Sequence, residues 1–216
     1  MDFGRLRVLA CAMIFTIPGP ALLFGQRPSE DRIYRFERQI VPVEDFKADG
    51  HILDIGGGGE GIIGRIKPSQ VVAIDLSKEE LVGAPAGSLK IVMDATDLKF
   101  LDGSFKTATS FFTLMFMKEE DQPRAVREIF RVLARGGRFL LWEVTVPERA
   151  DPKRDVFVIP LLVKLPREEV STGYGAFWPP RVHDESYFVK MAEAAGFKVL
   201  ARRQHGLTFF LEFEKP

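Results

Sequence analysis

Short apolar runs alternate with amphipathic stretches over most of the chain. Runs rich in Val, Ile, Leu and Phe that close on an acid or a glycine predict buried strands. Seven such runs follow one another, at residues 51–55, 71–74, 89–93, 106–112, 139–146, 199–203 and 207–213. The last two are separated by His205 and Gly206, a pair typical of a tight hairpin turn.

Helical spacing appears between these runs. Residues 62–66 predict a short helix, and Ser77 with Glu80 forms a capping box at the start of another. Residues 121–135 carry one apolar stripe and are followed by Gly136, which predicts a helix that ends there. A last helix is expected near residues 184–195, before Gly196.

One further helix is expected nearer the N-terminus. Ile33, Phe36 and Ile40 recur at helical spacing and precede Pro42, which favours a short helix over this stretch.

This alternation of strands and helices predicts an α/β fold. We expect a doubly wound, mostly parallel, seven-stranded sheet of the Rossmann-like kind, with a terminal antiparallel strand pair. Ligands bind outside the carboxyl ends of the strands in such sheets. The acids Asp54, Asp75 and Asp94 fall at or near those ends.

The remaining segments suggest a division of the chain. Residues 27–216 form the predicted domain, and the long connection 151–181 holds two apolar runs that predict an inserted hairpin over the mouth of the site. Residues 1–26 form an apolar N-terminal segment. Its run 8–24 follows Arg5 and Arg7, as in a signal peptide or membrane anchor, whereas a buried or disordered segment fits the same pattern.

Composition narrows the classes of partner. The 216 residues suit one domain, and 30 basic residues balance 30 acidic ones, so no nucleic-acid partner is expected. A single cysteine, Cys11, and three scattered histidines give no expectation of a metal site.

A glycine-rich turn connects the first predicted strand to a helix. Gly56 to Gly59 are four consecutive glycines, which let the backbone approach a ligand closely. Asp75, at the end of the second strand, has the chemistry to accept hydrogen bonds from the two hydroxyls of an adenosyl ribose. Asp94, after the third strand, is placed to bind an adenine amino group.

Together these motifs resemble the class I S-adenosylmethionine (SAM) methyltransferases, closest to the ubiquinone/menaquinone-biosynthesis-like, small-molecule branch. The resemblance covers roughly residues 33–146. It implies SAM as cofactor and a set of cofactor-binding residues: Asp54, Gly56, Gly57, Gly58, Glu60, Gly61, Asp75, Leu76, Asp94 and Ala95.

The chain departs from the family pattern in its glycine loop. The usual spacing is Asp-x-Gly-x-Gly-x-Gly, whereas here Glu60 stands where the last glycine is expected and Gly61 follows it. Two other functions fit the same turn. One is an NAD(P)-dependent oxidoreductase, and the other is a SAM-binding protein without turnover.

The acceptor side is less defined. Glu143, Tyr174 and His183 are the candidate catalytic residues, and Met115, Phe116 and Met117 are candidates for an apolar pocket wall. We expect a small, fairly apolar acceptor, a monomer or homodimer, and a cytoplasmic protein. The same N-terminal pattern also fits membrane contact through residues 8–24 or export by an N-terminal signal.

Overall fold

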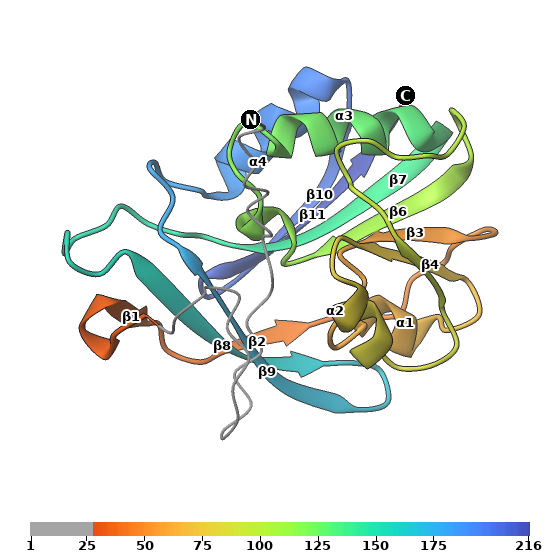
Figure 1. Ribbon diagram of the computed structural model, residues 1–216. Coiled ribbons are helices and arrows are strands. Elements are labelled where there is room, and N and C mark those ends of the chain that lie inside the picture. Colours follow the sequence, from red (N-terminus) through yellow and green to blue (C-terminus); the bar gives the residue numbers. More distant parts are fainter. Residues whose placement is uncertain (1–27) are drawn as a thin grey trace, which may run out of the picture.

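The computed structural model describes residues 28–216 and contains a seven-stranded sheet (Figure 1). Its strand order is β10-β11-β7-β6-β3-β4-β5. The strands span β3 (Ile52–Ile55), β4 (Val71–Asp75), β5 (Leu89–Val92), β6 (Phe105–Phe111), β7 (Leu133–Val144), β10 (Lys198–His205) and β11 (Thr208–Glu214).

The pairing confirms the predicted fold class. β3, β4, β5, β6 and β7 pair in parallel, whereas β11 runs antiparallel to both β7 and β10. The hairpin of β10 and β11 inserts β11 next to β7, so the last strand of the chain is not at the sheet edge. Strand order reverses beside β3, where β4 leads to one side and β6 to the other. This is the place where α/β sheets bind ligands.

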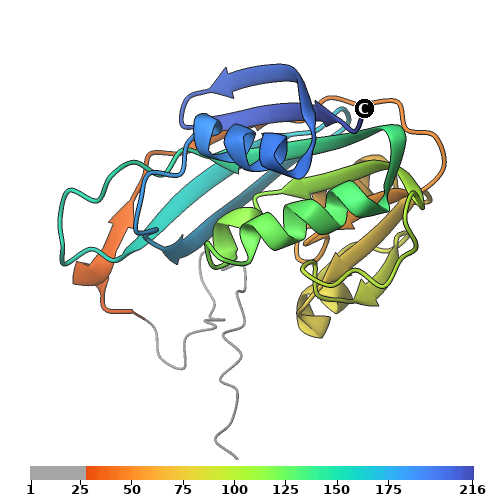
Figure 2. The same cartoon turned by 90° about the horizontal axis from the view of Figure 1, so that it is seen from above.

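Two helices cover one face of this sheet, α3 (Gln122–Val132) and α4 (Glu185–Ala195) (Figure 2). Val126 and Ile129 of α3 pack with Phe188 of α4 in the core between helices and sheet. The predicted helix 121–135 extends three residues too far at its C-terminal end. Leu133 is already extended, with φ −75° and ψ 139°, so β7 begins where α3 ends and no loop intervenes.

A second, four-stranded sheet covers part of the opposite face, beside the short helix α1 (Ile62–Ile66). Its strands are β1 (Ile33–Arg35), β2 (Gln39–Pro42), β8 (Val156–Lys164) and β9 (Glu169–Phe177). β8 and β9 form an antiparallel hairpin within the 151–181 segment. The other edge of β8 pairs in parallel with β1 and then with β2.

The helix predicted from Ile33 to Ile40 is therefore wrong, because these residues form β1 and β2. The side chains that become buried are Ile33, Val41 and Val43, while Ile40 is 52% exposed. Val41 and Val43 show the two-residue alternation of a strand. Their partner β8 lies more than a hundred residues further along the chain, so local spacing carries no sign of it.

The remaining elements are short: η1 (Glu30–Arg32), α2 (Lys78–Gly83) and η2 (Leu114–Phe116). Among the described helices, none is long and apolar enough to cross a membrane. The apolar run 8–24 lies outside the described residues.

Candidate active site

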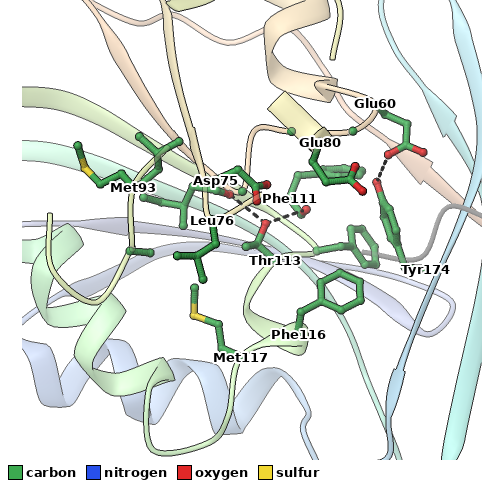
Figure 3. A pocket seen from close by; sticks show the side chains of 17 residues that line it. Glu60, Asp75, Leu76, Glu80, Met93, Phe111, Thr113, Phe116, Met117 and Tyr174 are labelled. Atoms are coloured by element: carbon green, nitrogen blue, oxygen red, sulfur yellow. Dashed lines mark hydrogen bonds between the residues drawn. The ribbon is translucent and has the colours of Figure 1, made fainter. Parts of the chain in front are cut away.

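A cavity opens at the carboxyl ends of β3, β4 and β6 (Figure 3). It holds about 710 Å³ of space free of protein atoms, part of it open to solvent, which suits a ligand of cofactor size. Seventeen residues line it: Ile55, Gly56, Gly58, Gly59, Glu60, Ile74, Asp75, Leu76, Glu80, Met93, Ala95, Phe111, Phe112, Thr113, Phe116, Met117 and Tyr174.

The glycine loop forms the floor of the cavity because its backbone packs tightly on its neighbours. A Cβ on Gly56 would lie 2.3 Å from Thr113 Oγ1, and Gly56 has φ +70°. A Cβ on Gly58 would lie 2.8 Å from Asp75 Oδ2 and 2.7 Å from Glu80 Cβ. Glycine at these two positions therefore leaves Asp75 and Glu80 facing the cavity with no loop side chain between them.

Asp75 is the best-placed carboxylate for a ribose. Its Oδ1 accepts a hydrogen bond from the backbone N–H of Ser77 at 2.8 Å, which orients the side chain at the end of β4. Burial raises the pKa of Asp75, and the backbone N–H groups of Ser77, Gly58 and Leu76 act in the opposite direction. Leu76 and Ala95, which the family resemblance assigns to the adenosine of SAM, line the same cavity.

Asp54 lies beneath the loop and does not line the cavity. It is buried at the end of β3, and its Oδ1 accepts a hydrogen bond from the Thr109 hydroxyl at 2.7 Å. Burial raises the pKa of Asp54 to about 7. The side chain thus supports the loop from the sheet side.

Other predicted cofactor residues also lie off the cavity wall. Asp94 is exposed, and its Oδ1 accepts hydrogen bonds from the backbone N–H and the hydroxyl of Thr96, both at 2.8 Å. It closes a turn of its own chain, while its neighbour Ala95 faces the cavity. Gly57 and Gly61 are buried in the loop and are not among the lining residues.

Glu60 connects the glycine loop to the β8–β9 hairpin. Its carboxylate accepts hydrogen bonds from the hydroxyl of Thr172 and, at 3.2 Å, from that of Tyr174. Arg65 strengthens the junction, because its Nε donates to the Glu60 carbonyl at 2.7 Å and its Nη1 lies 3.1 Å from Glu168. The residue that breaks the family's glycine spacing therefore binds the inserted hairpin.

Aromatic rings form the cavity wall opposite Asp75 and Leu76. The ring centroid of Tyr174 lies 5.6 Å from that of Phe112 and 6.0 Å from that of Phe116. Phe112 has φ +51°, an uncommon conformation for a non-glycine residue, which aims its ring into this wall. Burial raises the pKa of Tyr174 well above its ordinary value, and the neighbouring Glu60 adds to the shift. Tyr174 is therefore a neutral phenol here.

The other two candidate catalytic residues lie outside the cavity wall. Glu143 is buried in β7, and its Oε1 accepts a hydrogen bond from the backbone N–H of Met115 at 3.2 Å. His183 is buried near the start of α4, with its Nε2 3.0 Å from Glu119 and its ring stacked on Tyr187. Burial is also the main reason that the pKa of His183 is lowered.

The structure adds cavity residues that the sequence did not assign to the site: Glu80, Met93, Phe111 and Phe112. Glu80 was recognised only as part of the capping box. Its place in the first turn of a helix that follows the second strand was the available indication, since that turn faces the glycine loop. The rings of Phe111 and Phe112 belong to the apolar end of β6 and gave no such indication.

The cavity has a marked charge. Three carboxylates line it, those of Glu60, Asp75 and Glu80 (Figure 3). Among the described residues, no lysine, arginine or histidine side chain lines the cavity. Such a site favours a ligand with positive charge, as the sulfonium and ammonium groups of SAM provide, and the Asp75 carboxylate suits its ribose hydroxyls. The residues present therefore fit SAM.

Comparisons with known proteins agree with this geometry. A methyltransferase domain model matches residues 53–141. The ubiquinone/menaquinone biosynthesis C-methyltransferase UbiE of Rubrivivax gelatinosus is 32% identical over 186 residues, which cover 81% of this chain and 71% of that protein. The enzyme of the same name from Pseudoalteromonas translucida is 28% identical over 128 residues, 52% of this chain and only half of that protein.

A solved structure gives the same picture for the fold alone. A SAM-dependent methyltransferase from Methanosarcina mazei aligns with a TM-score of 0.57 at 21% identity, covering 79% of this chain and 94% of that one. The sheet order, the acidic cavity and the match to the Rubrivivax protein lead to one assignment. The chain belongs to the class I SAM-dependent methyltransferases, in their ubiquinone/menaquinone-biosynthesis-like branch.

Proposed function

We propose that this protein transfers the methyl group of SAM to a small, uncharged aromatic acceptor of the hydroquinone kind. The observation that carries the proposal is the two-sided cavity. One side presents Asp75, Leu76 and Ala95, and the other presents the rings of Phe112, Phe116 and Tyr174. The names of the quinone-biosynthesis relatives support an acceptor of this chemistry.

In this proposal the residues on one side of the cavity bind the cofactor and those on the other side bind the acceptor. SAM supplies an electrophilic methyl group on a positively charged sulfur. Asp75 binds the ribose hydroxyls, and Leu76, Met93 and Ala95 surround the adenine. The aromatic wall orients the acceptor ring and keeps water away. Alignment of this kind supplies much of the acceleration in a direct displacement.

We further propose that the β8–β9 hairpin is the acceptor-binding part of the domain. Tyr174 of β9 reaches the cavity, and Glu60 holds the hairpin against the cofactor loop. The hairpin thereby brings acceptor and cofactor together on one rigid frame.

The acidic lining argues against a nicotinamide dinucleotide. Its pyrophosphate carries two negative charges and would face Glu60, Asp75 and Glu80 without a basic side chain from the lining residues. The pyrophosphate and these carboxylates would repel one another, and repulsion between like charges is strong in a partly desolvated site.

The test is a transfer assay with radiolabelled SAM under anaerobic conditions, so that the acceptor stays reduced. We expect methylation of a short-chain naphthohydroquinone, identified by mass spectrometry, and much slower transfer to the same ring bearing a carboxylate. Asp75→Asn should weaken SAM binding about tenfold, as measured by calorimetry. Tight SAM binding by the wild type without transfer to any neutral aromatic acceptor would refute the proposal and favour a SAM-binding protein without turnover.

A further inference from the structure

Most polar side chains that line the cavity are hydrogen-bond acceptors. Glu60, Asp75 and Glu80 only accept hydrogen bonds when ionised. The Thr113 hydroxyl donates to the carbonyl of Ile55 at 2.9 Å, and the Tyr174 hydroxyl donates to Glu60. An acceptor molecule therefore gains most if it donates a hydrogen bond of its own.

Of the three carboxylates, Glu60 is the one that a hydrogen bond joins to the aromatic wall, through the hydroxyl of Tyr174. Figure 3 shows Asp75 on the side of Leu76 and Met93, whereas Glu60 faces Tyr174 at the other end of the cavity. Glu80 lies between them and packs against Gly58 next to Asp75. A ring stacked among Phe112, Phe116 and Tyr174 thus has Glu60 and Glu80 as neighbouring carboxylates, and Glu60 is the one fixed to this wall by a hydrogen bond.

The surroundings of Glu60 hold it in place and leave it able to react. Thr172 donates to Oε1 and Tyr174 to Oε2, so each oxygen is fixed by one hydroxyl. A carboxylate accepts about four hydrogen bonds, and these two leave room for a third donor. Arg65 binds the Glu60 backbone carbonyl, not the carboxylate, so within residues 28–216 no cation pairs directly with the reactive oxygens.

From this arrangement we infer that Glu60 is a catalytic residue that binds the acceptor hydroxyl and takes its proton during methyl transfer, and that Tyr174 is its positioning residue. The inference rests on the proposed function. It assigns a chemical role to the residue that replaces a glycine of the family pattern.

The step balances as follows in atoms and charge. Glu60 removes the hydroxyl proton while the adjacent ring carbon forms a bond to the methyl carbon, and the methyl–sulfur bond breaks with its electron pair left on sulfur. The ring hydrogen at the new bond then leaves to water as a proton, and Glu60 returns its proton to the acceptor oxygen. The positive charge of the sulfonium thus reappears as one released proton.

The decisive experiment compares wild type and variant on two acceptors at one pH, one with a weakly acidic hydroxyl and one whose hydroxyl is already ionised. For each acceptor the ratio of the two kcat values is measured at saturation, so the slower reaction of an anion in the acidic cavity affects both enzymes alike. Glu60→Gln keeps one oxygen that accepts from one of the two hydroxyls, its NH2 group can donate to the oxygen of the other, and it cannot take a proton. We expect its kcat to fall about 100-fold with the first acceptor, a usual contribution of general-base catalysis, and far less with the second. Calorimetry should show SAM affinity within about threefold of the wild type, since the bonds to the hairpin remain.

Two further variants separate catalysis from hairpin attachment. Tyr174→Phe keeps the ring but frees one carboxylate oxygen, and should lower kcat about tenfold with the same rescue by the ionised acceptor. Glu168→Gln removes the ion pair with Arg65 at the hairpin tip but leaves both bonds to the Glu60 carboxylate, so any change in kcat should be equal for the two acceptors. Equal kcat for wild type and Glu60→Gln, or an equal loss with both acceptors, would overturn the role of Glu60. A wild type inactive on every neutral aromatic acceptor would refute the proposed function itself.

Discussion

Glu143 lies inside the sheet with its two carboxylate oxygens in different situations. Oε1 accepts the Met115 N–H, whereas Oε2 has no hydrogen-bond partner among the described residues. Burial raises the pKa of Glu143 from 4.5 to about 8. Its bond to Met115 fixes η2, which carries Phe116 into the aromatic wall. Glu143 thereby supports the acceptor side from outside the cavity.

This pKa makes stability depend on pH with a defined sign. Between about pH 4.5 and pH 8 the folded protein keeps the proton on Glu143 while the unfolded chain has lost it, so stability falls as pH rises. Glu143→Gln cannot ionise and removes this dependence. We expect the melting temperature of the wild type to drop by at least about 3 °C more than that of the variant between pH 5.5 and 8.5. The pKa of Asp54 is also raised, but Asp54 is present in both proteins, so its effect on the melting temperature cancels in the comparison. Parallel pH curves for the two proteins would contradict the assignment.

The sequence predicts the position of a single residue at the cavity well when that residue lies at the end of one strand. Asp75 is the last residue of β4, so the pattern predicts its position at the cavity. Asp94 shows the limit, because two residues of local turn geometry decide whether its carboxylate faces the cavity or Thr96. The partner of Glu60 was not visible at all, since Tyr174 is 114 positions away.

The N-cap residues of α2 and α4 allow a matched test of whether the position of α2 controls SAM binding. Ser77 Oγ accepts from the Glu80 N–H at 3.1 Å at the start of α2, and Asp184 Oδ1 accepts from the Tyr187 N–H at 2.8 Å at the start of α4. Replacing either cap by alanine should cost about 1 kcal/mol of unfolding free energy, measured with urea. Only Ser77→Ala should also weaken SAM binding, because α2 carries Glu80 and adjoins Asp75. An equal loss of SAM affinity in Asp184→Ala would show that general destabilisation, not the position of α2, controls the site.

Elements with local caps and periodicity were the ones that the sequence predicted well. α1 and α4 begin and end within one residue of the expected positions, since glycines and an acidic cap determine their ends. The helix predicted across β1 and β2 is wrong because their burial comes from β8, a partner distant in sequence. Long-range pairing overrode the local spacing of Ile33, Phe36 and Ile40.

At the scale of the whole molecule, the second sheet is the feature that the sequence did not show. The seven-stranded sheet follows from alternating runs, but the joining of an N-terminal pair of strands to a hairpin near residue 160 needs the tertiary structure. This joining matters for function, because it anchors β8 and β9 on both edges of β8 and so gives Tyr174 a rigid base.

The charge of the molecule is also distributed unevenly, and this leads to a last prediction. The chain as a whole is neutral, with 30 basic and 30 acidic residues, yet Glu60, Asp75 and Glu80 give the cavity a negative field. SAM carries one more positive charge than S-adenosylhomocysteine and has otherwise nearly the same shape. We therefore expect calorimetry to show SAM binding about tenfold more tightly than S-adenosylhomocysteine at low salt, a difference of about 1.4 kcal/mol in binding free energy, with NADH not binding.

Added salt should narrow this preference for SAM, because it screens the partly exposed carboxylates. Glu80→Gln should narrow it as well, while Glu79→Gln, one position away on the exposed side of α2, should not. Equal affinities for the two ligands at every salt concentration would mean that contacts with the shared adenosyl and amino-acid parts, not the acidic lining, determine which ligand the cavity holds.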